Sequence, residues 1–179
     1  MSEEKKKDPP VDPLIGRRLE RGYTVLAKLG EGGMGSVYRG VHEPTGRAVA
    51  VKVVGKAQER AEEVLARFGI EADALTRLRH GCIVDILDRG TIDGAPYLVM
   101  ELVEGVPLDV MLQARGRLHY KEVIHILCSV LSALEAAHQQ GIAHRDIKPE
   151  NIMVRRTGIG YLVKVLDFGI ARIMNGAPR

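Results

Sequence analysis

The residues best suited to chemistry gather in two short stretches of the C-terminal half. HRDIKPEN, residues 144–151, places three basic groups, two acids and an amide between apolar runs. LDFG, residues 166–169, adds an isolated carboxylate, Asp167, after the apolar strand pattern YLVKVL. Asn151 and Asp167 offer the oxygen ligands that a hard divalent cation such as Mg²⁺ prefers. The alternatives are a solvated loop for the first stretch and a simple turn for the second. The apolar flanks favour a polar loop held over a core.

A glycine-rich stretch in the N-terminal half could bind phosphate. LGEGGMGSVYRG, residues 29–40, has four glycines within six positions. A dinucleotide-binding loop would continue into a helix, but a strand pattern follows here. The nucleotide-binding pattern GxxxxGK[ST] also fails, because Ser36 follows Gly35. Two readings stay open: a plain flexible hairpin, and a hairpin whose backbone N–H groups bind phosphate oxygens.

Lys52 is a single charge within the apolar run RAVAVKVV. It is either an edge-strand lysine that reaches water along its stem or a buried ammonium that needs an anion. The second reading predicts a carboxylate on the helix that follows. Spacing alone does not choose among the acids of that segment, which are Glu59, Glu62, Glu63, Glu71 and Asp73.

Alternating apolar residues and turn signals predict the elements that position these groups. Five strands are expected over 22–30, 36–43, 47–54, 82–90 and 95–103, with a long amphipathic helix over 57–80. A short helical segment over 105–116 and a second long helix over 121–141 follow, with Gly141 as its C-terminal cap. Strands first and helices after indicate an α+β protein in two lobes, with a seam near residues 103–105.

Composition excludes several classes of protein. The formal net charge of +3 is too small to argue for a nucleic-acid partner. No apolar run approaches the roughly 18 residues of a membrane helix. Cys82 and Cys128 fit neither a disulfide framework nor a zinc site, which suits a reducing, cytoplasmic compartment, although a longer membrane-anchored form stays open. Residues 1–14 read as a disordered tail, 15–103 as the first lobe and 104–179 as part of the second.

Taken together, the motifs resemble those of the eukaryotic-like serine/threonine protein kinases, from about residue 15 to the end. GEGGMGSV, AVAVK, HRDIKPEN and DFG occur in the order of that family. The resemblance implies a five-stranded antiparallel N-lobe with one long helix and the first part of a mainly helical C-lobe. It also implies transfer of the γ-phosphate of ATP to serine and threonine hydroxyls of proteins, with Mg²⁺.

The resemblance assigns roles to single residues. Asp146 would accept the proton of the substrate hydroxyl or orient that hydroxyl, and Lys148 would stabilise the transferred phosphoryl group. Lys52 would hold the α- and β-phosphates and pair with Glu71. Asn151 and Asp167 would bind Mg²⁺. The other nucleotide-binding residues that the resemblance implies are Leu29, Gly30, Glu31, Gly32, Gly33, Gly35, Val37, Ala50, Met100, Glu101, Val103 and Met153.

The chain departs from the family after DFGIARIMNGAPR, where the family continues through an activation segment and further helices. We therefore expect an incomplete kinase domain, with weak or no peptide phosphorylation by this chain itself. The apolar stripe of the helix over 121–141 is expected to be exposed and to favour dimerisation. The alternative function is a catalytically impaired kinase-like fragment that binds nucleotide or acts as a regulatory or interaction module.

Overall fold

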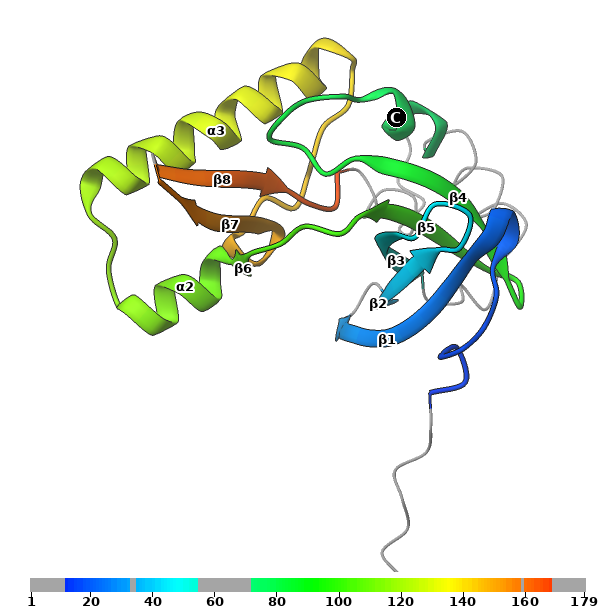
Figure 1. The fold of residues 1–179 in the computed structure, drawn as a ribbon. Coiled ribbons are helices and arrows are strands. Elements are labelled where there is room, and N and C mark those ends of the chain that lie inside the picture. Colours follow the sequence, from blue (N-terminus) through cyan, green and yellow to red (C-terminus); the bar gives the residue numbers. More distant parts are fainter. Residues whose placement is uncertain (1–11, 33–34, 55–71, 159, 169–179) are drawn as a thin grey trace, which may run out of the picture.

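A five-stranded antiparallel sheet forms the first lobe (Figure 1). A computed structural model describes residues 12–32, 35–54, 72–158 and 160–168 of the chain. The sheet order β1-β2-β3-β5-β4 confirms the predicted five-stranded antiparallel N-lobe. Its strands are β1 (Tyr23–Gly32), β2 (Gly35–His42), β3 (Arg47–Val54), β4 (Ile86–Ile92) and β5 (Ala95–Glu101).

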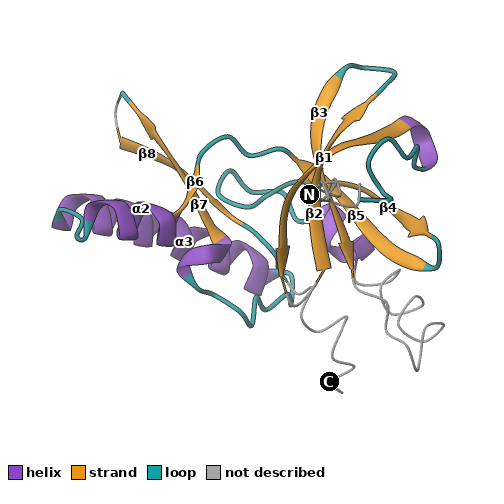
Figure 2. Ribbon diagram, turned by 90° about the horizontal axis from the view of Figure 1, so that it is seen from below, coloured by secondary structure: helices purple, strands orange, loops and turns teal. Residues whose placement is uncertain are grey.

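Over the residues that the structure describes, the second lobe contains two helices and a small sheet of order β6-β7-β8. Helix α3 lies along this sheet in both views (Figures 1 and 2). The elements of the second lobe are β6 (Val106–Pro107), α2 (Leu108–Arg115), α3 (Tyr120–Gln139), β7 (Ile152–Thr157) and β8 (Gly160–Val165). Short 3₁₀ turns occupy Glu20–Gly22 and Pro149–Asn151.

The alternation of β3 sends its side chains into two separate cores. Val49, Val51 and Val53 pack on the outer face of the sheet. Ala50 and Val54 face the other way, into a core that continues through the second lobe and includes its strands β7 and β8. The inner core therefore joins the two lobes, and the inner face of β3 borders the region between them.

One predicted strand is wrong at its start. The sequence pattern predicts a strand over 82–90, whereas β4 begins at Ile86. Residues 82–85 instead run beside β8: Val84 N donates to Val165 O at 3.0 Å, and Val165 N donates to Cys82 O at 2.8 Å. The apolar pattern identifies extended residues but not the strand with which they pair. It therefore merges residues 82–85, which lie beside β8, with β4, which pairs with β5. Of the helix predicted over 57–80, residues 72–77 are helical, whereas 78–80 are described and not helical; residues 57–71 lie outside the described residues.

Helix α3 begins and ends at recognisable caps. His119 accepts from Lys121 N while Glu122 accepts from His119 N, which closes a capping box. At the other end Gly141 has φ +73°, a left-handed conformation typical of the residue after a helix, as predicted. In the part of the chain that the structure describes, no helix combines the length and apolar character needed to span a membrane.

Helix α3 is apolar on two sides. Its buried side consists of Ile126, Val130, Ala133 and Ala137. The stripe predicted from the sequence consists of Ile124, Leu127, Leu131 and Leu134. The first three are exposed, with Leu127 at 53% and Leu131 at 63%, whereas Leu134 packs against the inner core. The expected exposure is thus observed for three of the four residues, and dimerisation through them stays a prediction.

Glu122 fastens α2, α3 and β8 together. Its carboxylate accepts two hydrogen bonds from Arg115 at 3.0 Å each and one from the Tyr161 hydroxyl at 2.7 Å. These bonds, the Arg115 pair foremost, lower the pKa of Glu122 from 4.5 to about 2. The ionised form is therefore favoured by folding.

The Glu122→Gln variant is expected to lose stability in a pH-dependent way. Because the folded pKa is depressed, the contribution of Glu122 is complete above about pH 4.5 and disappears as the pH falls towards 2. Urea unfolding of both proteins should show a gap in midpoint at pH 7 that narrows below pH 4.5. Glu135→Gln, an exposed acid on the same helix, is the control and should show no such gap. A gap that does not depend on pH would contradict the assignment.

Candidate active site

Lys52 is buried and paired across the lobes. Its side chain is 6% exposed, and Nζ lies 2.6 Å from Asp167 Oδ2. A buried ammonium needs such a partner, so the structure decides between the two readings of this lysine. The predicted partner Glu71 lies outside the described residues. Asp73, another acid that the sequence offered, pairs instead with Arg89 at 2.9 Å.

The polar loop 144–151 folds back on itself around Asp146. Lys148 Nζ lies 2.9 Å from Asp146 Oδ2, and Asn151 Nδ2 donates to the same carboxylate oxygen at 3.0 Å and to Asp146 O at 2.8 Å. The 3₁₀ turn that begins at Pro149 makes this return possible, because the proline ring presets φ for the turn. Sequence reasoning assigned these three residues to one site, and the structure brings them together.

Electrostatics keep this cluster ionised. The bond from Lys148 is the main reason that the pKa of Asp146 is lowered, and the reciprocal bond raises the pKa of Lys148. The Asp167 carboxylate also contributes to the raised pKa of Lys148. Asp146 is therefore an anion at neutral pH, able to accept a hydrogen bond from a hydroxyl group.

His144 anchors the loop to the strand end that carries Asp167. Its Nε2 lies 2.6 Å from Leu166 O, and Asp146 N donates to its Nδ1 at 3.3 Å. These two partners select the neutral tautomer with the proton on Nε2. Burial lowers the pKa of His144, against the effect of the Leu166 carbonyl. The ring also packs edge-on against Phe168, with centroids 4.6 Å apart.

Two residues beside the site have left-handed backbones. Arg145 has φ +67° and Asp167 has φ +60°. Non-glycine residues rarely adopt this region, and such strain concentrates at functional sites. The main chain is further fixed here, because Leu166 N donates to Asn151 O at 2.8 Å. The two metal-ligand candidates, Asn151 and Asp167, are thereby held close to each other.

The glycine-rich stretch is a hairpin between β1 and β2, as its strand context predicted. Glu31 pairs with Ser36 and Gly32 with Gly35, whose φ is +127°. Val37 is the partner of Lys52 in the β2–β3 register and packs against the inner core. The hairpin therefore emerges directly above the buried lysine. Gly33 lies outside the described residues.

Several of the other predicted nucleotide-binding residues line the junction of the lobes. Ala50 and Met100 are buried partners in the β3–β5 register, and Val103 packs against the same core. Met153 is half-buried on β7. Leu29, at the outer end of this group, is 53% exposed.

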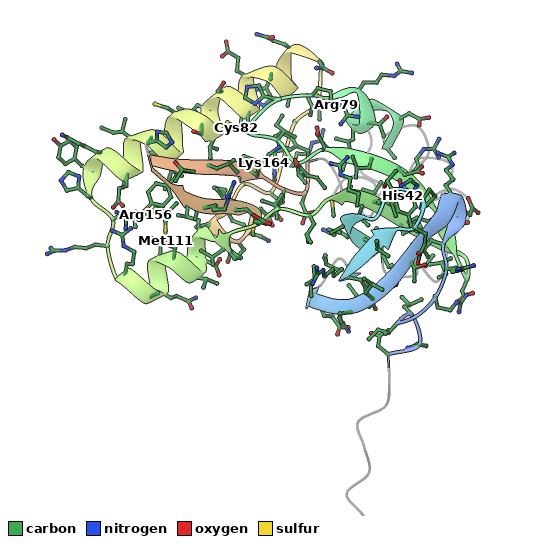
Figure 3. All side chains as sticks on the ribbon, viewed as in Figure 1. His42, Arg79, Cys82, Met111, Arg156 and Lys164 are labelled. Atoms are coloured by element: carbon green, nitrogen blue, oxygen red, sulfur yellow. The ribbon has the colours of Figure 1, made fainter. Side chains whose placement is uncertain are left out.

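Lys164 is a site residue that the sequence analysis did not identify. Figure 3 labels Lys164 on β8. Its Nζ donates to Ile83 O at 2.9 Å and to the Glu101 carboxylate. The same carboxylate oxygen accepts from Asp85 N at 2.9 Å, and Glu101 N donates to Asp85 O at 3.0 Å. The end of β5 is thus fixed to the strand that leads to Asp167. The sequence did carry a signal for Lys164, because a single lysine within an apolar strand pattern is the feature that identified Lys52.

The donor set fits one hard cation. Asn151 directs its amide nitrogen to Asp146, which leaves its amide oxygen as a ligand, and Asp167 supplies a carboxylate. Among the described residues no group of three or more histidines, cysteines or acids converges as a self-sufficient metal cage. Mg²⁺ requires no such cage, since one or two protein oxygens complete its shell together with phosphates and water.

The fold and this arrangement define a class of protein. The family described as "Protein kinase domain" matches residues 23–179. The chain belongs to the protein kinase family. This confirms the family inferred from the glycine hairpin, the buried lysine and the two polar motifs.

Similar proteins include bacterial serine/threonine kinases. Pkn1 of Myxococcus xanthus is 44% identical over 90% of this chain, PknL of Mycobacterium tuberculosis (strain H37Rv) 41% over 93%, and PrkC of Bacillus subtilis 41% over 90%. The chain spans 23%, 41% and 24% of these relatives respectively.

Solved structures agree with the fold. The kinase domain of PknI from Mycobacterium tuberculosis has a TM-score of 0.76 at 33% identity, covering 92% of this chain and 69% of that one. A Rad53 structure in complex with AMP-PNP has a TM-score of 0.73 at 29% identity, covering 83% and 38%.

Proposed function

We propose that this chain carries the ATP site and catalytic loop of a serine/threonine protein kinase, which transfers the γ-phosphate of ATP to protein hydroxyls. The observation that carries the proposal is the Asp146–Lys148–Asn151 cluster beside the Lys52–Asp167 pair. It combines two cations for phosphate oxygens, one anion for a hydroxyl and two oxygen ligands for a metal. Phosphoryl transfer needs little more than such positioning and charge neutralisation.

Each residue has a definite task in this reaction. Asp146 accepts the hydrogen bond of the substrate hydroxyl and orients it towards the γ-phosphate. Lys148, paired with Asp146, faces the charge that develops on the transferred group. Lys52 binds the α- and β-phosphates. Mg²⁺, held by Asn151 and Asp167, would neutralise charge on the phosphate oxygens.

The nucleotide lies between the lobes in this proposal. The backbone of Gly30, Gly32 and Gly35 covers its phosphates, and Val37, Ala50 and Met153 enclose the adenine. The main chain at Glu101 and Val103 bonds the adenine edge. Support comes from the hairpin register above Lys52 and from the similarity to Rad53, solved in complex with AMP-PNP. The protein is proposed to act in the cytoplasm.

A second candidate rests on the exposed side of α3. A chain whose Leu127 and Leu131 are open to solvent fits a nucleotide-binding interaction module that dimerises through α3. The two candidates share the ATP site and differ in phosphate transfer.

Calorimetric titration of the 179-residue chain with ATP tests the shared part. ATP is expected to bind, and more tightly with Mg²⁺, because Asn151 and Asp167 would hold the metal and the metal would neutralise charge on the phosphates. Incubation of the chain and of the native gene product with γ-labelled ATP and a serine/threonine protein then separates the candidates. We expect little transfer by the chain and clear transfer by the gene product. Absence of ATP binding would refute both candidates, and absence of transfer by the gene product would leave the module.

A further inference from the structure

The residues before β1 form a strap along the first lobe. We call residues 12–19 the N-terminal strap, drawn in dark blue ahead of β1 in Figure 1. Gly16 N donates to Val25 O at 2.8 Å, and Val25 N donates to Arg17 O at 3.0 Å. The strap thus adds backbone bonds to the edge strand of the sheet. A described part of the predicted tail, Asp12 to Leu14, belongs to this ordered strap.

The two ends of the strap make side-chain contacts with different elements of the sheet. At one end Arg17 makes two hydrogen bonds, at 3.1 and 3.2 Å, to Asp93 in the turn between β4 and β5. At the other end Asp12 accepts from Leu14 N at 3.1 Å and from the Tyr38 hydroxyl at 3.0 Å. Tyr38 is buried on β2, within the glycine hairpin's second strand. The Asp12 end therefore contacts the hairpin itself.

A chain of polar contacts continues from Asp12 to the glycines. Lys28 Nζ lies 3.6 Å from Asp12 Oδ2 and 2.6 Å from Glu31 Oε2. Glu31 stands between Gly30 and Gly32, the glycines proposed to cover phosphate. Lys28 is also the register partner of Tyr38. Asp12 thus contacts both strands of the hairpin, one through Tyr38 and the other through Lys28.

The space behind the hairpin is hollow. A cavity of about 480 Å³ lies between the strap, the hairpin and strands β3 and β4. Leu14 of the strap lines it together with Gly32 and Gly35 of the hairpin, and Val53 and Ile92 form its other walls. Because this side of the hairpin is not closely packed, the polar contacts to Asp12 determine the position of the hairpin relative to the proposed phosphate site.

We propose that Asp12 is a positioning residue, which holds the glycine hairpin over the nucleotide phosphates through Tyr38 and Lys28. The inference rests on the proposed function, in which the hairpin covers ATP. Loss of Asp12 lets the hairpin move into the cavity behind it, so its N–H groups retreat from the phosphates. Of the three residues proposed to enclose the adenine, Ala50 and Met153 lie on other strands, and Val37 lies on β2. Adenosine binding is therefore affected less than Mg-ATP binding.

The test compares a ligand with phosphates and one without. Affinities of the 179-residue chain for Mg-ATP and for adenosine are measured for wild type, Asp12→Ala and Tyr38→Phe. Asp12→Ala is expected to weaken Mg-ATP binding about fivefold, the worth of a typical hydrogen bond, and to weaken adenosine binding less. Tyr38→Phe removes one hydroxyl only, so it keeps the test valid if Asp12→Ala does not fold. It should lower the ratio of the Mg-ATP affinity to the adenosine affinity, as Asp12→Ala does.

The control variant removes the other side-chain contact of the strap, the ion pair between Arg17 and Asp93. Asp93→Asn releases Arg17 but does not contact the hairpin's polar chain, so the ratio of the two affinities should stay at the wild-type value. The role of Asp12 is overturned by an unchanged Mg-ATP affinity in both Asp12→Ala and Tyr38→Phe, by a gain in that affinity, or by an equal loss for both ligands. A wild-type chain that binds neither ligand refutes the proposed function instead.

Discussion

Replacing Asp146 with asparagine is expected to lower phosphate transfer by the native gene product about 10²- to 10⁴-fold, the usual contribution of a positioned base. Asparagine has the same size, and its amide oxygen still accepts the bond from Asn151 that closes the loop. It lacks the charge that holds Lys148 and that orients a hydroxyl. The loss should therefore appear in turnover and not in folding or Mg-ATP affinity.

Initial rates with γ-labelled ATP measure this change, and calorimetry on the variant chain checks that Mg-ATP still binds. Glu150→Gln removes an exposed acid from the same loop and is the matched control, with turnover close to wild type. A variant at position 146 that retains more than about a tenth of the wild-type turnover would remove this carboxylate from the mechanism.

Local chemistry made much of the fold predictable. Strand β3 begins and ends where the sequence predicts, because a turn signal precedes an uninterrupted alternation. The glycine stretch was predictable as a hairpin, since a strand pattern follows it. Polar residues of one short loop, such as Asp146 and Asn151, meet because a 3₁₀ turn leaves them few other conformations.

Partners far apart in the chain were not predictable from patterns. Lys52 and Asp167 are 115 positions apart, and Lys164 and Glu101 are 63 apart. A lone lysine in an apolar strand signals that an anion is needed but does not say which one. Periodicity has the same limit on α3, where Val130 is buried and Leu131 is exposed although both are apolar. Which side packs depends on the neighbouring sheet.

Strain at the site was also invisible in the sequence. Arg145 and Asp167 adopt left-handed backbones that neither residue prefers. Local conformational preference predicts a negative φ at both residues. Surrounding hydrogen bonds, such as that from Leu166 N to Asn151 O, impose the left-handed conformation instead. Such exceptions to local preference are expected where function fixes a side chain.

Replacing Lys52 with methionine is expected to weaken Mg-ATP binding about 10- to 100-fold, the worth of a hydrogen bond to a charged group. Methionine keeps most of the apolar stem, so packing against the inner core changes little. The same substitution leaves Asp167 without the ammonium 2.6 Å away. We expect a loss of about 1–3 kcal/mol in the free energy of unfolding, below the cost for a fully buried pair, because Asp167 remains 21% exposed.

The double variant Lys52→Met, Asp167→Asn separates the two effects. Neutralising both partners removes the unpaired charge, so part of the stability should return, as it does when buried ion pairs are replaced together. Mg-ATP binding should not return, because the phosphate ligand and the metal ligand are both gone. Lys148→Met is the stability control: its ion pair is of similar length, at 2.9 Å, but its side chain is 45% exposed, so unfolding should change little. Denaturant titration with and without Mg-ATP measures both quantities, and recovery of nucleotide binding in the double variant would show that Lys52 acts only through Asp167.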